Sequence, residues 1–523
     1  MIFYTNAIWI LNGAMMTIFF LFASYLSEGS SLGGVVATTA FFFNHGECTR
    51  VMNTPPLRES FAYPFCICHM FVVTMVLKRK NPSYWLSAIL AITTVSFMLP
   101  WQFAQFALLT QLLAVFGVHA IQYTNRNNTV KYLAGIWAGF IISFAFLLGN
   151  KMLITSYFFS ALISVSILIY LEKISPKFLW FPIAVLIKTL FVLLASICFK
   201  MVLSRLLNIQ DDAHISDILR SKFTDYRDFH TMLYTCAAEF DFLPMKTVTD
   251  LCKTLLVPTA AICCIVVLIY HLKDEYTKWR MNDNNAERTG GEVIYNILQL
   301  CAYTLMAAII MRLKLFFTPH LCLISGLIAS PKYFSFIKKK SLYYGLIFVV
   351  LALMAYEGKK NLEVELSRTG EYSDLQTEGL FDWIEKKTKK SAVFAGPMPT
   401  MANIKLSTGR PVVNHPHYED SALRERNKKV YSIFSRRATK TVYATLREMY
   451  VQYVVIAHHW CFGSSKSGCS MYESWDLEEP NFKNQPIVCK SLIQNGKSEY
   501  FEKVFDNQQY SVFKLKNPRL FKK

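Results

Sequence analysis

The chain has 523 residues, of which 53% are hydrophobic and 15% aromatic, and its mean hydropathy is +0.28. These values exclude a soluble globular protein of this length and indicate an integral membrane protein. The formal net charge is +19, but no basic arm or RNA-binding motif accompanies it, so we expect no nucleic-acid partner. The thirteen cysteines form no repeated CxxC pattern, and we therefore predict no metal site.

Apolar segments separated by short polar breaks recur from the first residues up to Tyr356. They predict roughly eleven or twelve transmembrane helices, several of them shorter than the twenty or so residues that a bilayer requires. The first segment has no basic region before it and no cleavage site after it, so we predict a helix there and not a removed signal. The segments cover residues 7–24, 32–44, 60–77, 84–99, 103–123, 132–149, 153–171, 178–199, 256–271, 293–311, 315–329 and 342–356.

The basic residues of the short loops give an orientation in the membrane. If the helices alternate, basic loops near residues 78–80, 126–131, 173–177 and 332–340 fall on one side, which the positive-inside rule makes cytoplasmic. The opposite, lumenal side then holds loops near residues 45–60, 201–255 and 312–320, and all of 357–523. The sequon Asn127-Asn128-Thr129 falls on the cytoplasmic side and is predicted to carry no glycan.

Residues 357–523 have the composition of a soluble domain, following the transmembrane region of residues 1–356. Strand patterns at 391–396, 410–415 and 451–460 alternate with helical patterns, which predicts a small parallel-sheet α/β domain. In an oxidising compartment Cys461 and Cys469 could pair, which would leave Cys489 over.

Residues 41–65, FFFNHGECTRVMNTPPLRESFAYPF, gather charged side chains at a membrane boundary. Such a cluster usually faces a water-filled cavity or a ligand, although an ordinary polar loop is the alternative. Pro55 and Pro56 hold the chain extended between two arginines, and fixed guanidinium groups suit a phosphate. The candidate site residues of this stretch are His45, Glu47, Arg50, Arg58 and Glu59.

Two further polar breaks carry candidate residues. In residues 311–322, MRLKLFFTPHLC, charges interrupt two apolar segments, and cations that snorkel to the interface are the alternative. The long break at 205–250 could supply groups for acid–base chemistry, with an amphipathic helix on the membrane surface as the alternative. The first break contributes Arg312, Lys314 and His320, and the second contributes Asp211, Asp212, His214, Glu239 and Asp241. We predict that Arg50, Arg58, Arg312 and Lys314 bind a lipid phosphate.

Several long stretches, among them NHGECTRVMNTPPLRESFAYPF, LPWQFAQFALLTQ, MRLKLFFTPH and AVFAGPMPTMA, resemble the dumpy-nineteen-like protein C-mannosyltransferases. The resemblance covers essentially the whole chain. It implies a type C glycosyltransferase fold in the endoplasmic reticulum membrane, with a lumenal α/β domain after the helices. It also implies transfer of mannose from dolichyl-phosphate mannose to an indole carbon of tryptophan, with no other cofactor. The implied acceptors are secretory or membrane proteins with WxxW motifs, such as thrombospondin repeats and cytokine receptors.

This chemistry needs cations to stabilise the departing phosphate, which Arg50, Arg58 and Arg312 could provide, and a base to remove the ring proton. The resemblance implies that the base is an acidic residue of a first lumenal loop, expected upstream of Met1, so we assign no catalytic residue, and the shortened chain could be inactive. Two alternatives stay open. One is a non-catalytic scaffold of the same fold, of the nuclear-envelope or acrosome attachment type, in the inner nuclear membrane. The other is a polytopic transporter, which internal inverted repeats would favour.

Overall fold

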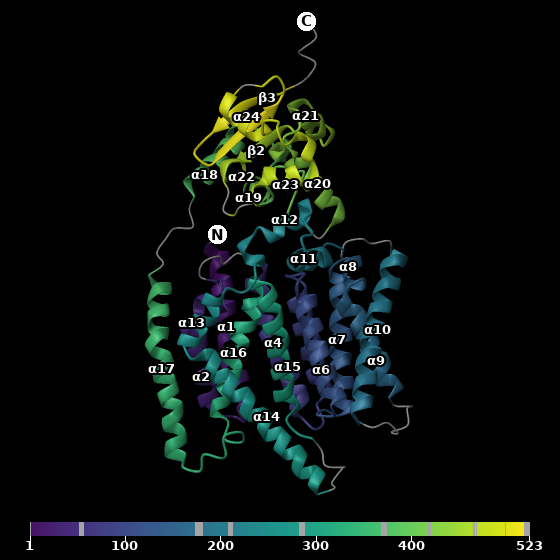
Figure 1. Ribbon diagram of the computed structural model, residues 1–523, viewed down its shortest axis with the longest axis vertical. Coiled ribbons are helices and arrows are strands. Elements are labelled where there is room, and N and C mark those ends of the chain that lie inside the picture. The colour runs from purple at the N-terminus through teal and green to yellow at the C-terminus, as the bar shows by residue number, and fades with distance from the viewer. Residues whose placement is uncertain are drawn as a thin grey trace. The chain divides into compact units, whose positions relative to one another are not determined.

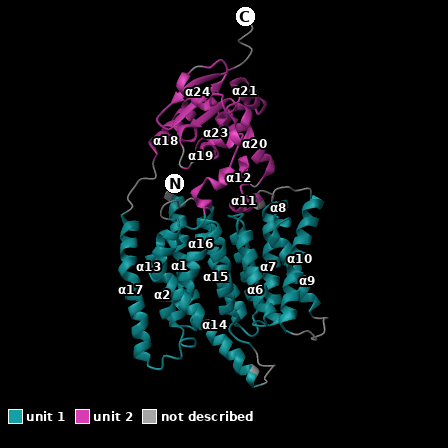
Figure 2. Cartoon of the chain, viewed as in Figure 1, with its two compact units in different colours: residues 1–209, 242–369 teal, residues 210–241, 370–523 magenta. Residues whose placement is uncertain are grey.

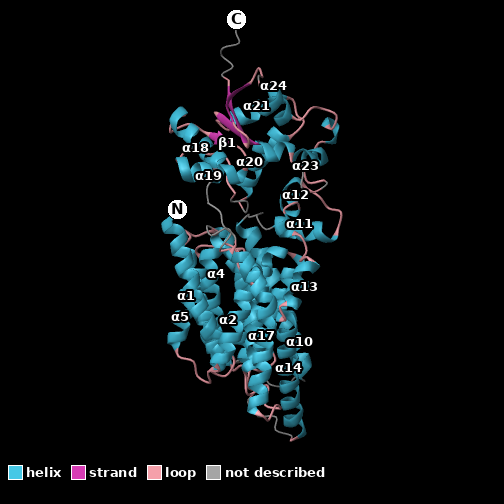
Figure 3. Ribbon diagram, turned by 90° about the vertical axis from the view of Figure 1, so that its left-hand side faces the viewer, coloured by secondary structure: helices cyan, strands magenta, loops and turns pink. Residues whose placement is uncertain are grey.

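A computed structural model describes residues 2–51, 57–172, 181–207, 213–281, 288–367, 374–416, 420–463, 466, 468–496 and 498–516. The chain divides into two units, Met1–Ile209 with Phe242–Thr369, and Gln210–Asp241 with Gly370–Lys523, called unit 1 and unit 2 below (Figure 2). Among the described residues, unit 1 is helical and the strands all lie in unit 2 (Figure 3). The segment Gln210–Asp241 lies between membrane helices in the sequence but folds with unit 2.

Eight described helical segments of unit 1 are long and apolar enough to cross a membrane, and four more apolar helices are shorter. The long ones are α1 (Ile2–Leu26), α4 (Arg58–Lys78), α7 (Arg126–Phe146), α10 (Phe181–Leu207), α14 (Leu256–Arg280), α15 (Gly291–Ile309), α16 (Lys314–Ser325) with its flanking turns η2 (Met311–Leu313) and η3 (Gly326–Ala329), and α17 (Lys340–Leu366). The shorter ones are α2 (Ser31–Phe43), α5 (Tyr84–Met98), α6 (Ala104–Ala120) and α9 (Tyr157–Leu171).

All twelve apolar segments predicted from the sequence therefore coincide with helices, which lie side by side in unit 1 (Figure 1). The prediction of a polytopic α-helical membrane protein with several short helices is confirmed, and the chain is a multi-pass membrane protein. Three short helices join the long ones: α3 (His45–Cys48), α8 (Lys151–Ile154) and α13 (Met245–Lys253).

Helix α16, which carries part of the candidate site, is largely buried by its neighbours. It packs against α2, α3, α14 and α15, and each of its residues from Phe316 to Ser325 is buried. Directly after it, Gly326 approaches the backbone of α2: a Cβ on Gly326 would lie 2.7 Å from the carbonyl oxygen of Gly33. Glycine at both positions lets the two backbones touch, which is the usual device for tight helix packing in membranes.

The sequon Asn127-Asn128-Thr129 lies in the first turn of α7. Thr129 is fully buried, and its hydroxyl lies 3.1 Å from Nδ1 of His119. Asn127 itself is exposed, so its lack of a glycan stays a prediction that rests on the orientation of the helices.

Unit 2 contains a four-stranded sheet in the order β1-β2-β4-β3, with β1 (Phe394–Ala395), β2 (Tyr453–Ala457), β3 (Phe501–Asp506) and β4 (Tyr510–Leu515). The small α/β domain is confirmed, but the parallel sheet is wrong for most of its pairings. Only β1 and β2 are parallel in this sheet, whereas β2–β4 and β3–β4 are antiparallel. The strand expected at 410–415 makes a single parallel bridge from Val412 to Phe394, partly because Pro411 has no N–H to donate.

Helices surround this sheet and form the rest of unit 2 (Figure 1). They are α11 (Ala213–Phe223), α12 (Phe229–Thr235), η1 (Ala238–Phe240), α18 (Leu375–Lys387), α19 (Met398–Thr408), α20 (Ser421–Tyr431), η4 (Ser432–Phe434), α21 (Thr439–Glu448), α22 (His458–Phe462), α23 (Met471–Glu478), η5 (Pro480–Phe482) and α24 (Val488–Asn495).

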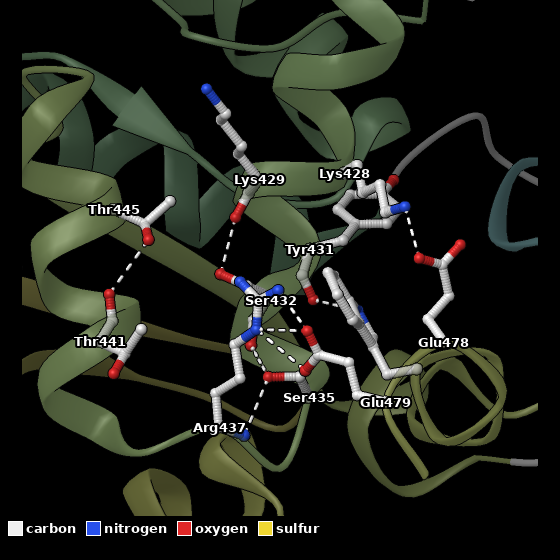
Figure 4. Close-up of polar contacts among 11 residues, drawn as sticks. Lys428, Lys429, Tyr431, Ser432, Ser435, Arg437, Thr441, Thr445, Glu478 and Glu479 are labelled. Atoms are coloured by element: carbon white, nitrogen blue, oxygen red, sulfur yellow. Dashed lines mark hydrogen bonds and ion pairs between the residues drawn. The ribbon is translucent and has the colours of Figure 1, made fainter. Parts of the chain in front are cut away.

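The core of unit 2 joins the inserted segment to the C-terminal residues. Phe229 of α12 is fully buried, and its ring lies 5.1 Å from that of Trp475 in α23. The indole N–H of Trp475 donates to the carbonyl oxygen of Tyr431 at 2.9 Å. Around this contact Lys428 pairs with Glu478 at 2.5 Å, and the guanidinium of Arg437 holds the Glu479 carboxylate (Figure 4). The insertion is thus an integral part of this core.

The thirteen cysteines separate by unit. Unit 2 has two disulfides, Cys236–Cys469 and Cys461–Cys489, whereas the nine cysteines of unit 1 are free. The pairing of Cys461 with Cys469 expected from the sequence is therefore wrong. The partner of Cys469 comes from the inserted segment, 233 residues earlier in the chain, where no local spacing could indicate it.

We expect unit 2 to lose stability as the pH falls from about 6.5 to about 4, because of His230 in α12. Burial, and then the neighbouring Lys428 and Arg424 cations, lower the pKa of this imidazole to about 4. Between about pH 6.5 and pH 4, His230 is therefore protonated in the unfolded state but not in the folded state. Above about pH 6.5 it is neutral in both states. The loss should be on the order of 1–2 kcal/mol, because the side chain is partly exposed and solvent screens part of the effect.

Hydrogen exchange of the β2 amides in the full chain, followed between pH 7 and pH 4 and corrected for the intrinsic rate, measures this loss. His230→Gln should flatten the dependence. An equally steep dependence in that variant would assign it to other groups.

Candidate functional site: a cation–carboxylate cluster

The charged residues predicted near the membrane boundary meet in unit 1 around the start of α16. We call Glu47, Arg50, Glu59, Arg312 and Lys314 the cation–carboxylate cluster. Its first members lie on α3, a one-turn helix that begins where α2 ends, and on the extended residues that follow it. Asn44, which directly precedes α3, holds the start of this helix in place, because its side chain accepts a hydrogen bond of 2.8 Å from the Thr254 hydroxyl.

Two ion pairs connect α16 and its preceding turn to the earlier part of the chain. Lys314 Nζ lies 2.6 Å from Glu47 Oε2, and Arg312 Nη2 lies 3.1 Å from Glu59 Oε2. The Glu59 side chain is only 5% exposed, and an isolated buried carboxylate would be costly. Glu59 also stands in the first turn of α4, where the helix dipole favours a negative charge. The two carboxylates therefore hold two cations in fixed positions.

A small pocket opens beside these pairs. It is lined by Asn12, Thr49, Arg50, Val51, Glu59, Ser60, Tyr63 and Leu315. Its volume is about 10 Å³, roughly the room that one water molecule needs. A phosphate group is larger, so binding one here requires the side chains around the pocket to move apart.

An aromatic wall stands beside this pocket. The ring of Phe316, two residues after Lys314, stacks on Trp101 with centroids 5.7 Å apart and planes 1° from parallel. Tyr63, which lines the pocket, lies edge-on to Phe316 at 5.8 Å. Cations beside an apolar wall suit a ligand that joins a phosphate to a hydrocarbon chain.

The structure brings together most, but not all, of the residues predicted for this site. Glu47, Arg50, Glu59, Arg312 and Lys314 meet, and Arg58 is exposed at the start of α4, next to Glu59. His45 begins α3, with its ring 6.3 Å from that of Phe41.

Other predicted residues lie elsewhere. His320 is buried within α16, and its Nε2 lies 2.8 Å from the carbonyl oxygen of Asn296, so it belongs to the helix interior. Glu239 and Asp241 lie in unit 2, where Asp241 pairs with Lys466 at 3.1 Å. Asp211 and Asp212, the Pro55-Pro56 pair and the side chain of His214 are outside the described residues.

The contacts of α3 and its neighbouring residues with α17 and α16 were not predicted from the sequence. A Cβ on Gly46 would lie 2.7 Å from Oε1 of Glu365, so the glycine gives the α17 carboxylate room to reach α3. Asn361 of α17 donates to the carbonyl oxygen of Phe43 at 3.0 Å. On the other side, the Cys48 and Cys322 sulfur atoms lie 3.9 Å apart. The glycine in NHGEC is the one local signal of this packing, and nothing in the sequence pointed to residues 361–365.

Comparison with known proteins identifies the family. The family model described as "Dpy19: Q-cell neuroblast polarisation" matches residues 1–515. The mouse "Protein C-mannosyl-transferase DPY19L1" is 44% identical over 522 residues, which cover 98% of this chain and 69% of the mouse protein. The Caenorhabditis elegans "C-mannosyltransferase dpy-19" is 39% identical over 515 residues, covering 98% of this chain and 74% of that protein.

Solved structures share the fold. The archaeal oligosaccharyltransferase AglB from Archaeoglobus fulgidus, solved with an inhibitory peptide and a dolichol-phosphate, superposes with a TM-score of 0.65. The match covers 95% of this chain and 68% of AglB at 10% sequence identity, so it concerns the fold alone. The type C glycosyltransferase fold expected from the sequence is confirmed. By its sequence over nearly the whole length, the chain belongs to the Dpy19 family, the family of these named C-mannosyltransferases.

Proposed function

We propose that this chain is a protein C-mannosyltransferase that moves mannose from dolichyl-phosphate mannose to an indole carbon of tryptophan in WxxW motifs. The observation that carries the proposal is the match over 98% of the chain to relatives named C-mannosyltransferases. The fold supports it, since AglB is also a glycosyltransferase and was solved with a dolichol-phosphate. Acceptors would be secretory or membrane proteins, such as those with thrombospondin repeats and cytokine receptors.

The cation–carboxylate cluster is our candidate for the donor phosphate. Arg50, Arg58, Arg312 and Lys314 would bind the phosphate, with Glu47 and Glu59 holding two of these cations in place. In the reaction, the bond between the mannose anomeric carbon and the phosphate oxygen breaks while a carbon–carbon bond forms to the indole. The leaving dolichyl phosphate gains negative charge, which fixed cations stabilise. The indole ring then loses a proton to a base, and we assign that role to no residue of this chain.

For the location we propose the endoplasmic reticulum membrane, with unit 2 in the lumen. Disulfides persist in oxidising compartments, and unit 2 has both disulfides while all cysteines of unit 1 are free. The inner nuclear membrane is the second candidate location.

The test is a C-mannosylation assay with a WxxW peptide and dolichyl-phosphate mannose. It is run on this chain and on a version extended by the residues by which its relatives are longer, since this chain covers 69% of the mouse protein. We expect a mannosylated tryptophan in at least the extended form, and loss of donor-lipid binding in Arg50→Ala. Donor binding without transfer in both forms would favour a non-catalytic scaffold of the same fold. Unchanged donor binding in Arg50→Ala would remove Arg50 from the phosphate site.

A further inference from the structure

Two buried thiols touch each other beside the cation–carboxylate cluster. Cys48 ends α3 and Cys322 lies in α16, and both side chains are fully buried. Their sulfur atoms are 3.9 Å apart, which is van der Waals contact between two thiols, although 274 residues separate them in the sequence. A disulfide has an S–S length of about 2.05 Å, so closing this contact requires an approach of about 1.9 Å.

The same two segments carry one ion pair of the cluster. Glu47 directly precedes Cys48, and Lys314 lies two turns before Cys322 on α16. The Lys314–Glu47 ion pair and the thiol contact therefore connect α3 to α16 at two points, which are adjacent in α3 and two turns apart in α16. A shift of Cys48 therefore displaces Glu47 as well.

Of the two segments, α3 is the shorter and the less buried. It is a single turn, whereas α16 is buried along most of its length. On its far side α3 is backed by α17, where Oε1 of Glu365 lies 2.7 Å from the position that a Cβ of Gly46 would take. A pull of Cys48 toward α16 would therefore draw Glu47 along and loosen the contact with α17.

We propose that Cys48 and Cys322 are an oxidisable pair that closes to a disulfide and thereby alters the donor-phosphate site. The proposal rests on the function proposed above for the cluster. In the closing step each thiol loses a proton and an electron, one S–S bond forms, and an oxidant takes up both hydrogens. A small disulfide is reduced to two thiols in this step, and diamide is reduced to the corresponding hydrazine.

A displacement of the order of an ångström at a binding site can lower a reaction rate by up to about 100-fold. We therefore expect oxidation of this pair to lower mannosyl transfer by at least about tenfold, and dithiothreitol to restore it. Reduction would return α3 to the position in which Glu47 and Lys314 lie 2.6 Å apart.

The experiment treats membranes containing the full chain with diamide, blocks the remaining thiols, and maps disulfide-linked peptides by mass spectrometry. Donor-lipid binding and mannosyl transfer are measured on the same samples. Cys322→Ala and Cys48→Ala should each abolish the linked peptide and the sensitivity to diamide. Cys263→Ala is the matched control, because Cys263 is also fully buried in unit 1 and should leave both intact.

A Cys48–Cys322 peptide that appears together with a reversible loss of transfer supports the proposal. Modification of the exposed Cys198 and Cys301 without that peptide would overturn it, and so would a disulfide that leaves both donor binding and transfer unchanged. If the reduced protein binds donor but shows no transfer, the proposed enzyme function fails on its own. Donor binding before and after diamide then decides whether the pair controls the site.

Discussion

Replacing Lys314 with glutamine should lower mannosyl transfer about 100-fold or more while the chain remains folded. Lys314 pairs with a carboxylate of α3, with its Nζ 2.6 Å from Glu47 and its side chain only 19% exposed. A fixed charge in such a shielded place stabilises a departing phosphate far better than a solvated one. Because Glu47 is itself 30% exposed, leaving it without this partner should cost little stability. The measurement is the initial rate of mannose incorporation into a WxxW peptide at saturating acceptor.

The control for this variant is Lys360→Gln. It makes the same chemical change on α17, where Lys360 is exposed and pairs with Glu357 at 2.8 Å. This variant should transfer mannose at the wild-type rate, and Lys314→Arg should retain part of the activity because it keeps the charge. Equal rates for the glutamine variants at 314 and 360, with both proteins folded, would show that the cluster does not serve the donor phosphate.

The second large effect is expected for Gly326→Ala, which should lower the free energy of unfolding by about 1–3 kcal/mol. The new Cβ would lie 2.7 Å from the carbonyl oxygen of Gly33, closer than such atoms can approach. The backbone of Gly326 has φ −59°, which alanine adopts without strain, so the cost comes from the clash alone. Since a backbone atom is in the way, α2 or the end of α16 must shift to relieve it.

Thermal unfolding of the purified protein in detergent measures this loss, with Gly345→Ala as the control. Gly345 lies in α17, and a Cβ there meets no atom within 4 Å. Alanine should therefore leave the stability unchanged there or raise it slightly, because it favours the helix more than glycine does. If the two alanine variants unfold at the same temperature, the contact between α2 and the end of α16 is not as tight as the structure indicates.

Lys314 and Gly326 lie at the two ends of α16. Helix α16 begins with Lys314 in the cluster and is followed by Gly326 against α2, and α2 in turn leads into α3 and Glu47. A shift of α2 or α16 caused by the clash at Gly326 should therefore displace Glu47 or Lys314. We expect Gly326→Ala to weaken donor binding as well as stability.

The sequence by itself determined the membrane architecture. Apolar length is a local property, and a segment of apolar residues must become a helix in a bilayer because its backbone polar groups have no other partners there. For this reason each of the twelve apolar segments coincides with a helix. The long sequence motifs also identified the family. In the same way, the charged residues of 41–65 and 311–322 were recognisable as candidates because ionisable groups are rare at membrane boundaries.

Which residues meet was decided by the tertiary structure alone. The pairs Glu59–Arg312 and Glu47–Lys314 join residues 253 and 267 positions apart. Cys236 reaches Cys469 across 233 positions, and the segment around it folds with unit 2 instead of the membrane helices. The C-terminal hairpin turned the expected parallel sheet into a mixed one. Composition and periodicity report only on neighbours along the chain, whereas these contacts result from the packing of whole helices and strands, which is why the sequence named the participants but not their partners.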